Sequence, residues 1–333
     1  MLRNRSLARS MGSPFSFRTY AALSPNSPVS PYQVFDRRAK ALQKDRAVSR
    51  EDGARSKLVD YLRREISERV LERFEDVKNS PKRVLELSSG SGIFSQLLDP
   101  DKVDSIELID MSKASLHRDP DSEFDVESIT RTQLDEEDLL THIPENSQDA
   151  IVTCMGLHWV NDLPGVLTQI QKALKPDGFF LGAMIGGESL FELRTSLQLA
   201  DQEREGGISP HISPMADPKD ASNLLQRAGF TLLTVDVEDI GFGYPSMYEL
   251  VEDLRDMGEG NAILGRRTFL KRDTLISASA IYEALHGVPS ENGQTTNIPA
   301  TFEVIFLMGW KPADSQPKPL ERGSGKTNLK DVL

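Results

Sequence analysis

The chain has 333 residues, of which 38% are hydrophobic and 27% are charged, and this is enough for one large globular domain with insertions. The formal net charge of −12 argues against a nucleic acid partner, because phosphate binding depends on Lys and Arg side chains. The single cysteine, Cys154, excludes a disulfide framework and a cysteine-based zinc cluster, and no apolar run approaches the roughly eighteen residues of a membrane-spanning helix.

The N-terminal segment differs in composition from the rest of the chain. Residues 1–23 are rich in Arg and Ser and contain no acidic residue; the first one is Asp36. This pattern predicts a mitochondrial transit peptide, with a disordered basic tail as the alternative. Residues 24–31 are rich in Ser and Pro and the following stretch is strongly charged, so we assign 24–50 to a linker and an N-terminal cap segment.

The first half of the body alternates between helical and strand patterns. Apolar residues recur at helical spacing from 56 to 74, which predicts an amphipathic helix. Four apolar, β-prone stretches predict strands, and helical patterns follow the first and third of them. The predicted strands cover residues 83–88, 105–112, 149–156 and 179–187, and the predicted helices cover 92–98 and 163–178, the second stopped by the turn Lys175–Gly178.

The second half continues the alternation and ends in a polar tail. Helices are predicted at 189–205, 220–229 (capped by Gly229), 246–257 and 273–286, and strands at 230–240 and 300–310. Residues 313–333 are predicted to be disordered, because they consist largely of Pro, Lys, Gly and Ser. Within them, RGSGKT (322–327) is similar to a phosphate-binding loop but has Leu320 where the first glycine should stand.

Alternating strands and helices predict an α/β fold with a parallel sheet covered on both faces. In such sheets ligands bind at the carboxyl ends of the strands. The segment Gly90–Ser95 lies at that place and nearly follows the pattern G-x-G-x-x-G, and Asp110 comes twenty residues after Gly90. This combination fits either a dinucleotide or adenosylmethionine.

Three observations favour adenosylmethionine as the cofactor. Glu86 precedes the loop, where its carboxylate suits a sulfonium and an ammonium but would repel a pyrophosphate. Asp135 or Glu136, in the stretch LDEED, could accept a hydrogen bond from the adenine amino group. These segments contain no Lys or Arg to neutralise a phosphate, and Asp110 would bind the ribose hydroxyls. The alternative is a tight turn whose acidic residues are merely solvated.

The sequence resembles a known family over roughly residues 31–323. The stretches VLELSSGSG, ELIDMS, LDEED and QDAIVTCMGLHWVNDLPGVL resemble class I adenosylmethionine-dependent methyltransferases close to the malonyl-carrier methyltransferases of the biotin pathway. The stretches GGESLFELRTSLQLADQEREGGISPHISP, YPSMYELVEDLRDMGEGNA and ATFEVIFLMGWKP are similar to mitochondrial assembly factors of respiratory complex I that have a methyltransferase fold and hydroxylate arginine.

The resemblance implies a Rossmann-like parallel sheet with an antiparallel last strand, in a domain spanning 51–312 with substrate-side insertions at 188–216 and 241–299. It adds Met111 and Met155 to the expected cofactor-binding residues, which also include Ser88, Gly90 and Gly92. It implies a protein substrate in complex I and a location in the mitochondrial matrix, with peripheral association with the inner membrane.

The chain departs from the family pattern in the Gly-rich loop. Ser88 replaces the first glycine, and Ser89 replaces the usual small residue or cysteine. A positive φ at Ser88 would cost about 1 kcal/mol or more. We therefore expect reduced, but not abolished, affinity for the cofactor.

The catalytic residues are not identified by any motif, but several candidates can be named. His158 and Trp159 follow the fourth strand, beside the reactive end of the cofactor in this architecture, with core packing as the alternative. Arg194 could bind a substrate carboxylate, or form a surface salt bridge with an acidic neighbour. Tyr244 could line a substrate entrance, or simply pack in its turn.

Other candidates have weaker support. His211, in ISPHISP, could contact the substrate, but lone loop histidines are usually solvated. Arg204 and Glu205 fit an ordinary surface helix. Cys154 is expected to be a buried small apolar residue.

Metal binding is not expected from the sequence. Oxygen-activating enzymes often use two histidines and a carboxylate to bind iron. Among the five histidines only His117 has an acidic residue two positions later, Asp119, and both are expected in a solvated loop. Arginine hydroxylation is therefore implied by the resemblance alone. A methyltransferase with a protein or small carboxylate substrate and a non-catalytic, cofactor-binding chaperone remain alternatives.

Overall fold

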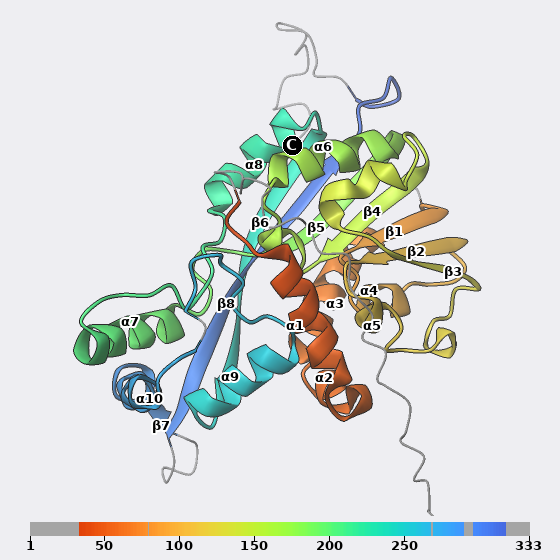
Figure 1. The fold of residues 1–333 in the computed structure, drawn as a ribbon. Coiled ribbons are helices and arrows are strands. Elements are labelled where there is room, and N and C mark those ends of the chain that lie inside the picture. Colours follow the sequence, from red (N-terminus) through yellow and green to blue (C-terminus); the bar gives the residue numbers. More distant parts are fainter. Residues whose placement is uncertain (1–32, 79, 268, 290–295, 318–333) are drawn as a thin grey trace, which may run out of the picture.

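The structure is a computed structural model that describes residues 33–78, 80–267, 269–289 and 296–317 (Figure 1). The strands of the described part are β1 (Arg83–Leu87), β2 (Ser105–Asp110), β3 (Ser128–Gln133), β4 (Gln148–Cys154), β5 (Leu174–Ile185), β6 (Thr231–Tyr244), β7 (Val288–Pro289) and β8 (Thr296–Trp310). The helices are α1 (Arg37–Ser49), α2 (Ala54–Leu58), α3 (Tyr61–Glu75), α4 (Ile93–Gln96), α5 (Lys113–Leu116), α6 (Leu163–Ala173), α7 (Phe191–Glu205), α8 (Pro218–Arg227), α9 (Met247–Asp256) and α10 (Arg272–His286).

The sheet has the strand order β3-β2-β1-β4-β5-β8-β6, with β7 paired to β8. Strands β1 to β5 pair in parallel, and β8 runs antiparallel to both of its long neighbours, β5 and β6. The chain order reverses between β1 and β4, which places the carboxyl ends of these two strands at the switch point of the sheet. The α/β fold, with its antiparallel last strand and helices on both faces, is confirmed.

Successive side chains of the central strands pack into opposite halves of the core. In β5, Phe179 and Leu181 belong to one buried cluster, whereas Phe180 lies in the other. Helix α3 covers the first face and α6 and α8 cover the second (Figure 1). These strands are apolar in nearly every position because both faces are buried.

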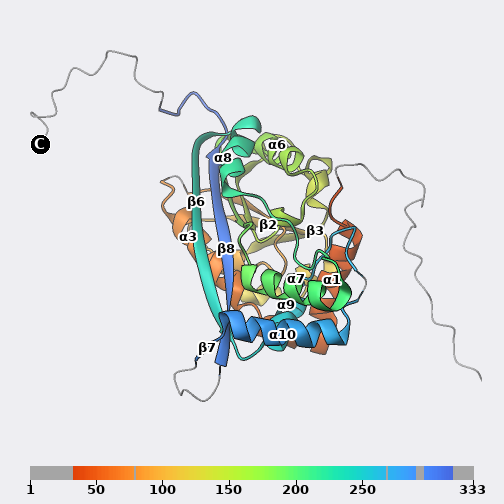
Figure 2. The same cartoon turned by 90° about the vertical axis from the view of Figure 1, so that its left-hand side faces the viewer.

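The long strand pair β6–β8 extends well beyond the parallel strands, and α7, α9 and α10 pack on this extension (Figures 1 and 2). Helix α1 lies across the sheet at the carboxyl ends of the strands, between the Gly-rich loop and α9 (Figure 1). The proposed insertions 188–216 and 241–299 supply α7, α9 and α10. Their assignment to the substrate side, like the other domain boundaries, stays a prediction.

Several predicted elements have different limits in the structure. The single helix expected at 56–74 is divided into α2 and α3, and Asp60 at the junction forms two hydrogen bonds with Arg118. Helix α6 ends at Ala173, five residues early, because the Lys311 ammonium binds the carbonyls of Lys172 and Leu174 and the chain continues directly as β5.

The charged segment assigned to a linker and cap contains a regular helix, α1, which the sequence did not predict. Its N-terminus is capped by the Asp36 carboxylate, which accepts a hydrogen bond from the Ala39 amide. The proposed transit peptide, 1–23, and most of the proposed tail, 318–333, lie outside the described residues. Among the described residues, no helix has the length and apolar character needed to cross a membrane.

Candidate functional site

The Gly-rich loop connects β1 to α4 at the carboxyl end of the sheet. Ser88, Gly90 and Gly92 all have positive φ angles, of 56°, 60° and 81°. For the L-residue Ser88 this conformation costs about 1–2 kcal/mol. A compensating contact comes from its hydroxyl, which donates a hydrogen bond of 2.5 Å to Glu136 Oε1. The strain expected at Ser88 is therefore present in the structure.

Glu86 is buried beneath the loop. Its Oε2 accepts hydrogen bonds from the amide and the hydroxyl of Ser95, at 3.1 and 2.5 Å. Ser95 occupies the position of the third glycine in the pattern G-x-G-x-x-G. Its hydroxyl gives Glu86 a hydrogen bond that a glycine could not. Burial nevertheless raises the pKa of Glu86 to about 7, against the lowering by Ser95 and Arg63. A buried carboxylate with a raised pKa favours a cationic group beside it.

Asp110 lies at the end of β2 and is fully buried. Its carboxylate accepts hydrogen bonds from the Gly90 amide at 3.0 Å, the Ser112 amide at 2.8 Å and the Lys44 ammonium at 2.8 Å. Burial alone would raise the pKa of Asp110, but the Lys44 charge and these bonds outweigh it and hold the pKa below its usual range. Asp110 is thus ionised and already paired.

Asp135 and Glu136 follow β3, and both form ion pairs with Arg37 of α1. Arg37 also donates a hydrogen bond of 3.0 Å to the Trp159 carbonyl. The loop segments themselves contain no Lys or Arg, but the N-terminal segment brings two cations to them. The expected acidic pocket is therefore corrected: Arg37 and Lys44, both on α1, neutralise these acidic residues in the structure.

A third cation, Arg63 of α3, lies beside the Gly-rich loop and was also missed. A Cβ added to Gly90 would lie 3.6 Å from the Arg63 Cζ atom, and the guanidinium donates a hydrogen bond of 2.6 Å to the Cys154 carbonyl. No sequence motif identifies Arg63, because it lies on a helix before the first strand.

The arrangement fits the two ends of adenosylmethionine differently. At the methionine end, Glu86 lacks a bonded cation, Arg63 offers a charge for a carboxylate, and the buried Ser89 hydroxyl has no hydrogen-bond partner among the described residues. At the adenosine end, Asp110 and Glu136 stand at the ends of β2 and β3. These side chains therefore fit the cofactor, provided that Lys44 releases Asp110 and Arg37 releases Glu136 when the cofactor binds.

The remaining expected cofactor residues lie around this loop. Met111 follows β2 directly, and its carbonyl accepts a hydrogen bond of 3.0 Å from Gln133. Met155 follows β4 and has a positive φ of 60°. Positive φ angles at Ser88 and Met155 thus occur at the ends of two neighbouring strands, and such strained positions cluster at functional sites.

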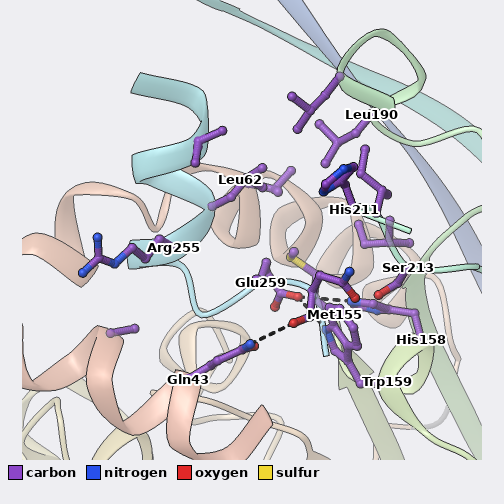
Figure 3. Close-up of a pocket in the computed structure, with 18 of the residues that line it drawn as sticks. Gln43, Leu62, Met155, His158, Trp159, Leu190, His211, Ser213, Arg255 and Glu259 are labelled. Carbon is purple, nitrogen blue, oxygen red and sulfur yellow. Dashed lines mark hydrogen bonds and ion pairs between the residues drawn. The ribbon is translucent and has the colours of Figure 1, made fainter. Parts of the chain in front are cut away.

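A large pocket of about 660 Å³ opens beside the end of β4. Its walls come from α1, α3, α7, α9, α10, the 3-10 turn Leu157–Trp159 and the segments near 185, 212 and 260. Met155, His158, Trp159 and His211 all line it (Figure 3). The volume is in the range typical of small-molecule sites.

The polar end of this pocket is built around Glu259, which the sequence analysis did not single out. Its Oε2 accepts hydrogen bonds of 2.6 Å from the Trp159 indole and 3.3 Å from His158 Nε2 (Figure 3). The segment DMGEGNA contains Glu259, but only the fold brings it to the turn after β4. Burial lowers the pKa of His158, so its imidazole is neutral near pH 7.

The other catalytic candidates lie elsewhere. Arg194 donates hydrogen bonds of 2.7 and 3.1 Å to the carbonyls of Gly187 and Ser189. It lines a second pocket, which adjoins the large one at the segment 211–215. Tyr244 is buried, and its hydroxyl shares a hydrogen bond with Tyr61. The structure thus brings His158, but neither Arg194 nor Tyr244, to the large pocket.

Of the weaker candidates, His211 is held by Asp201 at 2.8 Å, and Arg204 is half exposed beside Glu203. Glu205 binds Lys271 at 2.6 Å, as a surface helix would.

Cys154 is buried, and burial raises the pKa of its thiol. His117 is exposed as expected, but Asp119 is not in a solvated position, because it is buried in ion pairs with Arg118 and Lys57. The described residues contain no group of three or more His, Cys, Asp or Glu side chains that could hold a metal ion.

Comparison with known proteins places the sequence among methyltransferase-fold proteins. The family described as "Methyltransferase domain" matches residues 58–235. "Arginine-hydroxylase NDUFAF5, mitochondrial" of Danio rerio is 42% identical over 95% of this chain and 93% of its own length. The human protein of the same name is 40% identical over 94% of this chain and 87% of its own length.

More distant similarities agree with this placement. A malonyl-[acyl-carrier protein] O-methyltransferase of Halorhodospira halophila is 29% identical over 84% of this chain and 89% of its own length. The solved structure of a putative methyltransferase from Bacillus halodurans aligns with a TM-score of 0.50 at 14% identity, covering 74% of this chain and 99% of that one. This last similarity concerns the fold alone.

Proposed function

The chain belongs to the family of the NDUFAF5 arginine hydroxylases and contains a methyltransferase domain, and from this premise we propose that it hydroxylates an arginine side chain of a protein, with adenosylmethionine as its bound cofactor. Hydroxylation is a two-electron oxidation, so an oxygen donor from outside the chain must be the oxidant and the source of the inserted oxygen atom. The main support for this proposal is the 42% identity with the Danio rerio protein over 95% of the chain. The aligned region includes both the Gly-rich loop and the large pocket. The name of these relatives states the reaction, and the large pocket supplies a cavity that an arginine side chain could enter.

The position of the pocket supports the proposal. Met155 follows β4, which pairs with β1 immediately before the Gly-rich loop, and Met155 also lines the pocket. A molecule held by the loop would therefore lie next to whatever enters the pocket. Leu62, Leu193 and Leu197 provide apolar walls that suit the aliphatic part of an arginine side chain.

Each residue of the loop region has a distinct expected role. Bound adenosylmethionine supplies a sulfonium, whose positive charge Glu86 would stabilise. Arg63 would bind the carboxylate of the methionine end, and Asp110 would accept hydrogen bonds from the ribose hydroxyls once Lys44 has moved. Asp135 and Glu136 would contact the adenine. The protein would thereby orient the cofactor.

We further propose that the protein substrate is a subunit of respiratory complex I in the mitochondrial matrix, where this chain would bind the inner membrane only peripherally. The resemblance to complex I assembly factors supports the substrate, and the word "mitochondrial" in the relatives' names supports the compartment.

Two other functions use the same site. Methyl transfer is favoured by the family match and by the similarity to malonyl-carrier methyltransferases. Arg194 would be the natural ligand for a small carboxylate substrate, yet its Nη2 already donates to two backbone carbonyls and Arg194 does not line the large pocket. In a third possibility the protein binds the cofactor without catalysis and assists assembly as a chaperone.

Mass spectrometry separates the three functions. Complex I subunits would be compared between cells that carry the intact gene, cells that lack it, and cells complemented with Gly90→Arg. We expect one arginine to carry an additional oxygen atom in cells with the intact gene and to lack it in both defective lines. Loss of a methyl group would establish methyl transfer instead. Loss of complex I without any change of subunit mass would favour the chaperone.

A further inference from the structure

The large pocket contains an unusual concentration of buried polar atoms without hydrogen-bond partners. Among the described residues these atoms include Glu259 Oε1, Gln43 Oε1, His158 Nδ1 and Ser213 Oγ, and all four residues line the pocket. A buried polar atom that lacks a partner costs about 1–3 kcal/mol. Such a group of atoms therefore indicates a ligand whose own polar atoms complete it.

Three of the four atoms can only accept hydrogen bonds, whereas the Ser213 hydroxyl can donate or accept. Glu259 Oε1 belongs to a carboxylate, which accepts only. Gln43 is fixed in orientation because its Nε2 donates a hydrogen bond of 3.0 Å to the Asn261 carbonyl, so its free atom is a carbonyl oxygen. His158 Nε2 must carry the proton, since it faces the Glu259 carboxylate at 3.3 Å. His158 Nδ1 therefore has a free lone pair and can only accept. The missing ligand must accordingly be rich in hydrogen-bond donors.

The charge of Glu259 supports a cationic ligand. Burial alone would raise the pKa of Glu259, but the bond from His158 and the charges of Lys40 and Arg63 outweigh it and hold the pKa far below its usual range. The side chain is 8% exposed, yet it is ionised. Arg46, Arg50 and Arg255 also line the pocket, so the charge of Glu259 acts locally. An anionic group placed beside Glu259 would be repelled.

Two cations of the chain lie close to Glu259 but are bound to other partners. The Lys40 ammonium donates to the carbonyls of Gly258 and Gly260 and lies 3.3 Å from the centre of the Trp159 ring, and burial lowers its pKa to about 7. Arg63 Nη2 is 3.9 Å from Glu259 Oε1, which makes a long ion pair but is too far for a hydrogen bond. Neither cation therefore satisfies the free oxygen.

We infer that Glu259 and Gln43 form a recognition site for a guanidinium group, with Glu259 as the carboxylate that selects arginine among the side chains of the protein substrate; this rests on the proposed function. A guanidinium has five N–H donors, no acceptor and a permanent charge, and so it matches a carboxylate oxygen beside a carbonyl and an imidazole lone pair. Glu259 is a specificity-determining residue in this assignment, and His158 positions it. The apolar walls contact the aliphatic part of the same side chain.

The test uses a probe that carries only the recognised group. N-acetyl-arginine amide would be titrated into the Trp310→Phe protein, in which Trp159 is the remaining tryptophan and reports on its neighbour Glu259. N-acetyl-citrulline amide, of the same shape but neutral, is the matched ligand control. We expect saturable binding of the arginine probe, at least roughly tenfold tighter than that of the citrulline probe.

Two variants connect this binding to the named residues. Glu259→Gln keeps a carbonyl oxygen for the Trp159 indole but loses the charge, and Gln43→Met removes the second acceptor at nearly constant volume. Both should weaken binding of the arginine probe, Glu259→Gln by roughly tenfold or more, and Glu259→Gln should abolish the preference over citrulline. Glu252→Gln, on the exposed face of α9, is the control and should bind as the unmodified site does.

Three results would overturn the inference. These are equal binding of the arginine and citrulline probes, full affinity in Glu259→Gln with unchanged melting temperature, and preferential binding of N-acetyl-glutamate amide. The outcome is separate from that of the proposed function. Selective binding without oxygen insertion would reject hydroxylation and keep the recognition site, whereas hydroxylation that persists with unchanged KM in Glu259→Gln would reject the site and keep the function.

Discussion

The Lys44 ammonium of α1 lies 2.8 Å from Asp110 Oδ2 at the end of β2, and both side chains are buried. The pair joins the N-terminal helix to the position from which an acidic residue binds a ribose in proteins of this architecture. With the role proposed for Asp110, folding and cofactor binding would use the same carboxylate. Removing either partner should affect both properties.

Replacing Lys44 by Met should destabilise the protein. The variant leaves Asp110 buried with only its two amide donors, and breaking a buried ion pair in this way costs about 3–5 kcal/mol. Urea unfolding of the two proteins at pH 7 measures the difference. The double variant Lys44→Met/Asp110→Asn should recover much of the loss, because no uncompensated charge remains. Equal stability of the original protein and Lys44→Met would show that the pair contributes nothing.

Glu86 should make the folded protein less stable as the pH rises, which is the opposite of the usual effect of a carboxylate paired with a cation. Its pKa is about 7 in the folded protein against 4.5 for a solvated glutamic acid. Between these values the folded state retains a proton that the unfolded state has lost, so this group's contribution favours folding below pH 4.5 and disappears as the pH rises towards 7.

The variant Glu86→Gln isolates this contribution. It should unfold at higher urea concentration than the original protein at pH 8, by an amount equivalent to about 3 kcal/mol at most. At pH 5 the two proteins should differ much less. A difference that is the same at pH 5 and pH 8 would show that Glu86 does not titrate in this range.

Gly90→Arg should abolish binding of adenosylmethionine. Gly90 has a φ of +60°, and a side chain there would begin 3.6 Å from the Arg63 guanidinium, so the variant combines strain, bulk and like charge at the loop. Isothermal titration calorimetry measures the loss. Gly207→Arg is the matched control, because a Cβ at Gly207 has no atom within 4 Å. Undiminished binding in Gly90→Arg would place the cofactor elsewhere.

The sequence predicted those parts of the site that one continuous segment encodes. Glu86, Gly90 and Asp110 lie within a single strand–loop–helix–strand unit, where local patterns determine the positions of side chains. Lys44 and Arg37 could not be placed in this way. Their partners Asp110 and Glu136 lie 66 and 99 residues further along the chain, and their helix has no amphipathic pattern that would have distinguished it from a charged linker.

Glu259 illustrates the same limit for the large pocket. It lies 101 residues after His158, and its role arises only because α9 and the turn after β4 meet beside α1. Sequence reasoning found His158 from its place after a strand. It could not find the carboxylate that faces it, because a lone Glu in a loop is usually solvated.

Ser88→Gly should strengthen cofactor binding with little change in stability. Glycine relieves the strain of a φ of 56°, about 1 kcal/mol, and this offsets the lost hydrogen bond to Glu136. In the proposed site Ser88 would compete with the adenine amino group for Glu136. Its removal should then also return about 1 kcal/mol to binding, which is roughly a fivefold gain in affinity. Calorimetry with adenosylmethionine measures the affinity, and urea unfolding measures the stability.

Ser88→Ala separates the two contributions of this residue. Alanine lacks the hydroxyl but keeps the strained Cβ, so it should bind adenosylmethionine more tightly than the original protein and yet unfold at lower urea concentration than Ser88→Gly. Gly156 must stay a glycine in the original protein and in Ser88→Ala, since its added Cβ would lie 2.1 Å from the Ser88 side chain. If both variants bound the cofactor no better than the original loop, Ser88 would not restrict the site, and the serine would be a neutral replacement for the usual glycine.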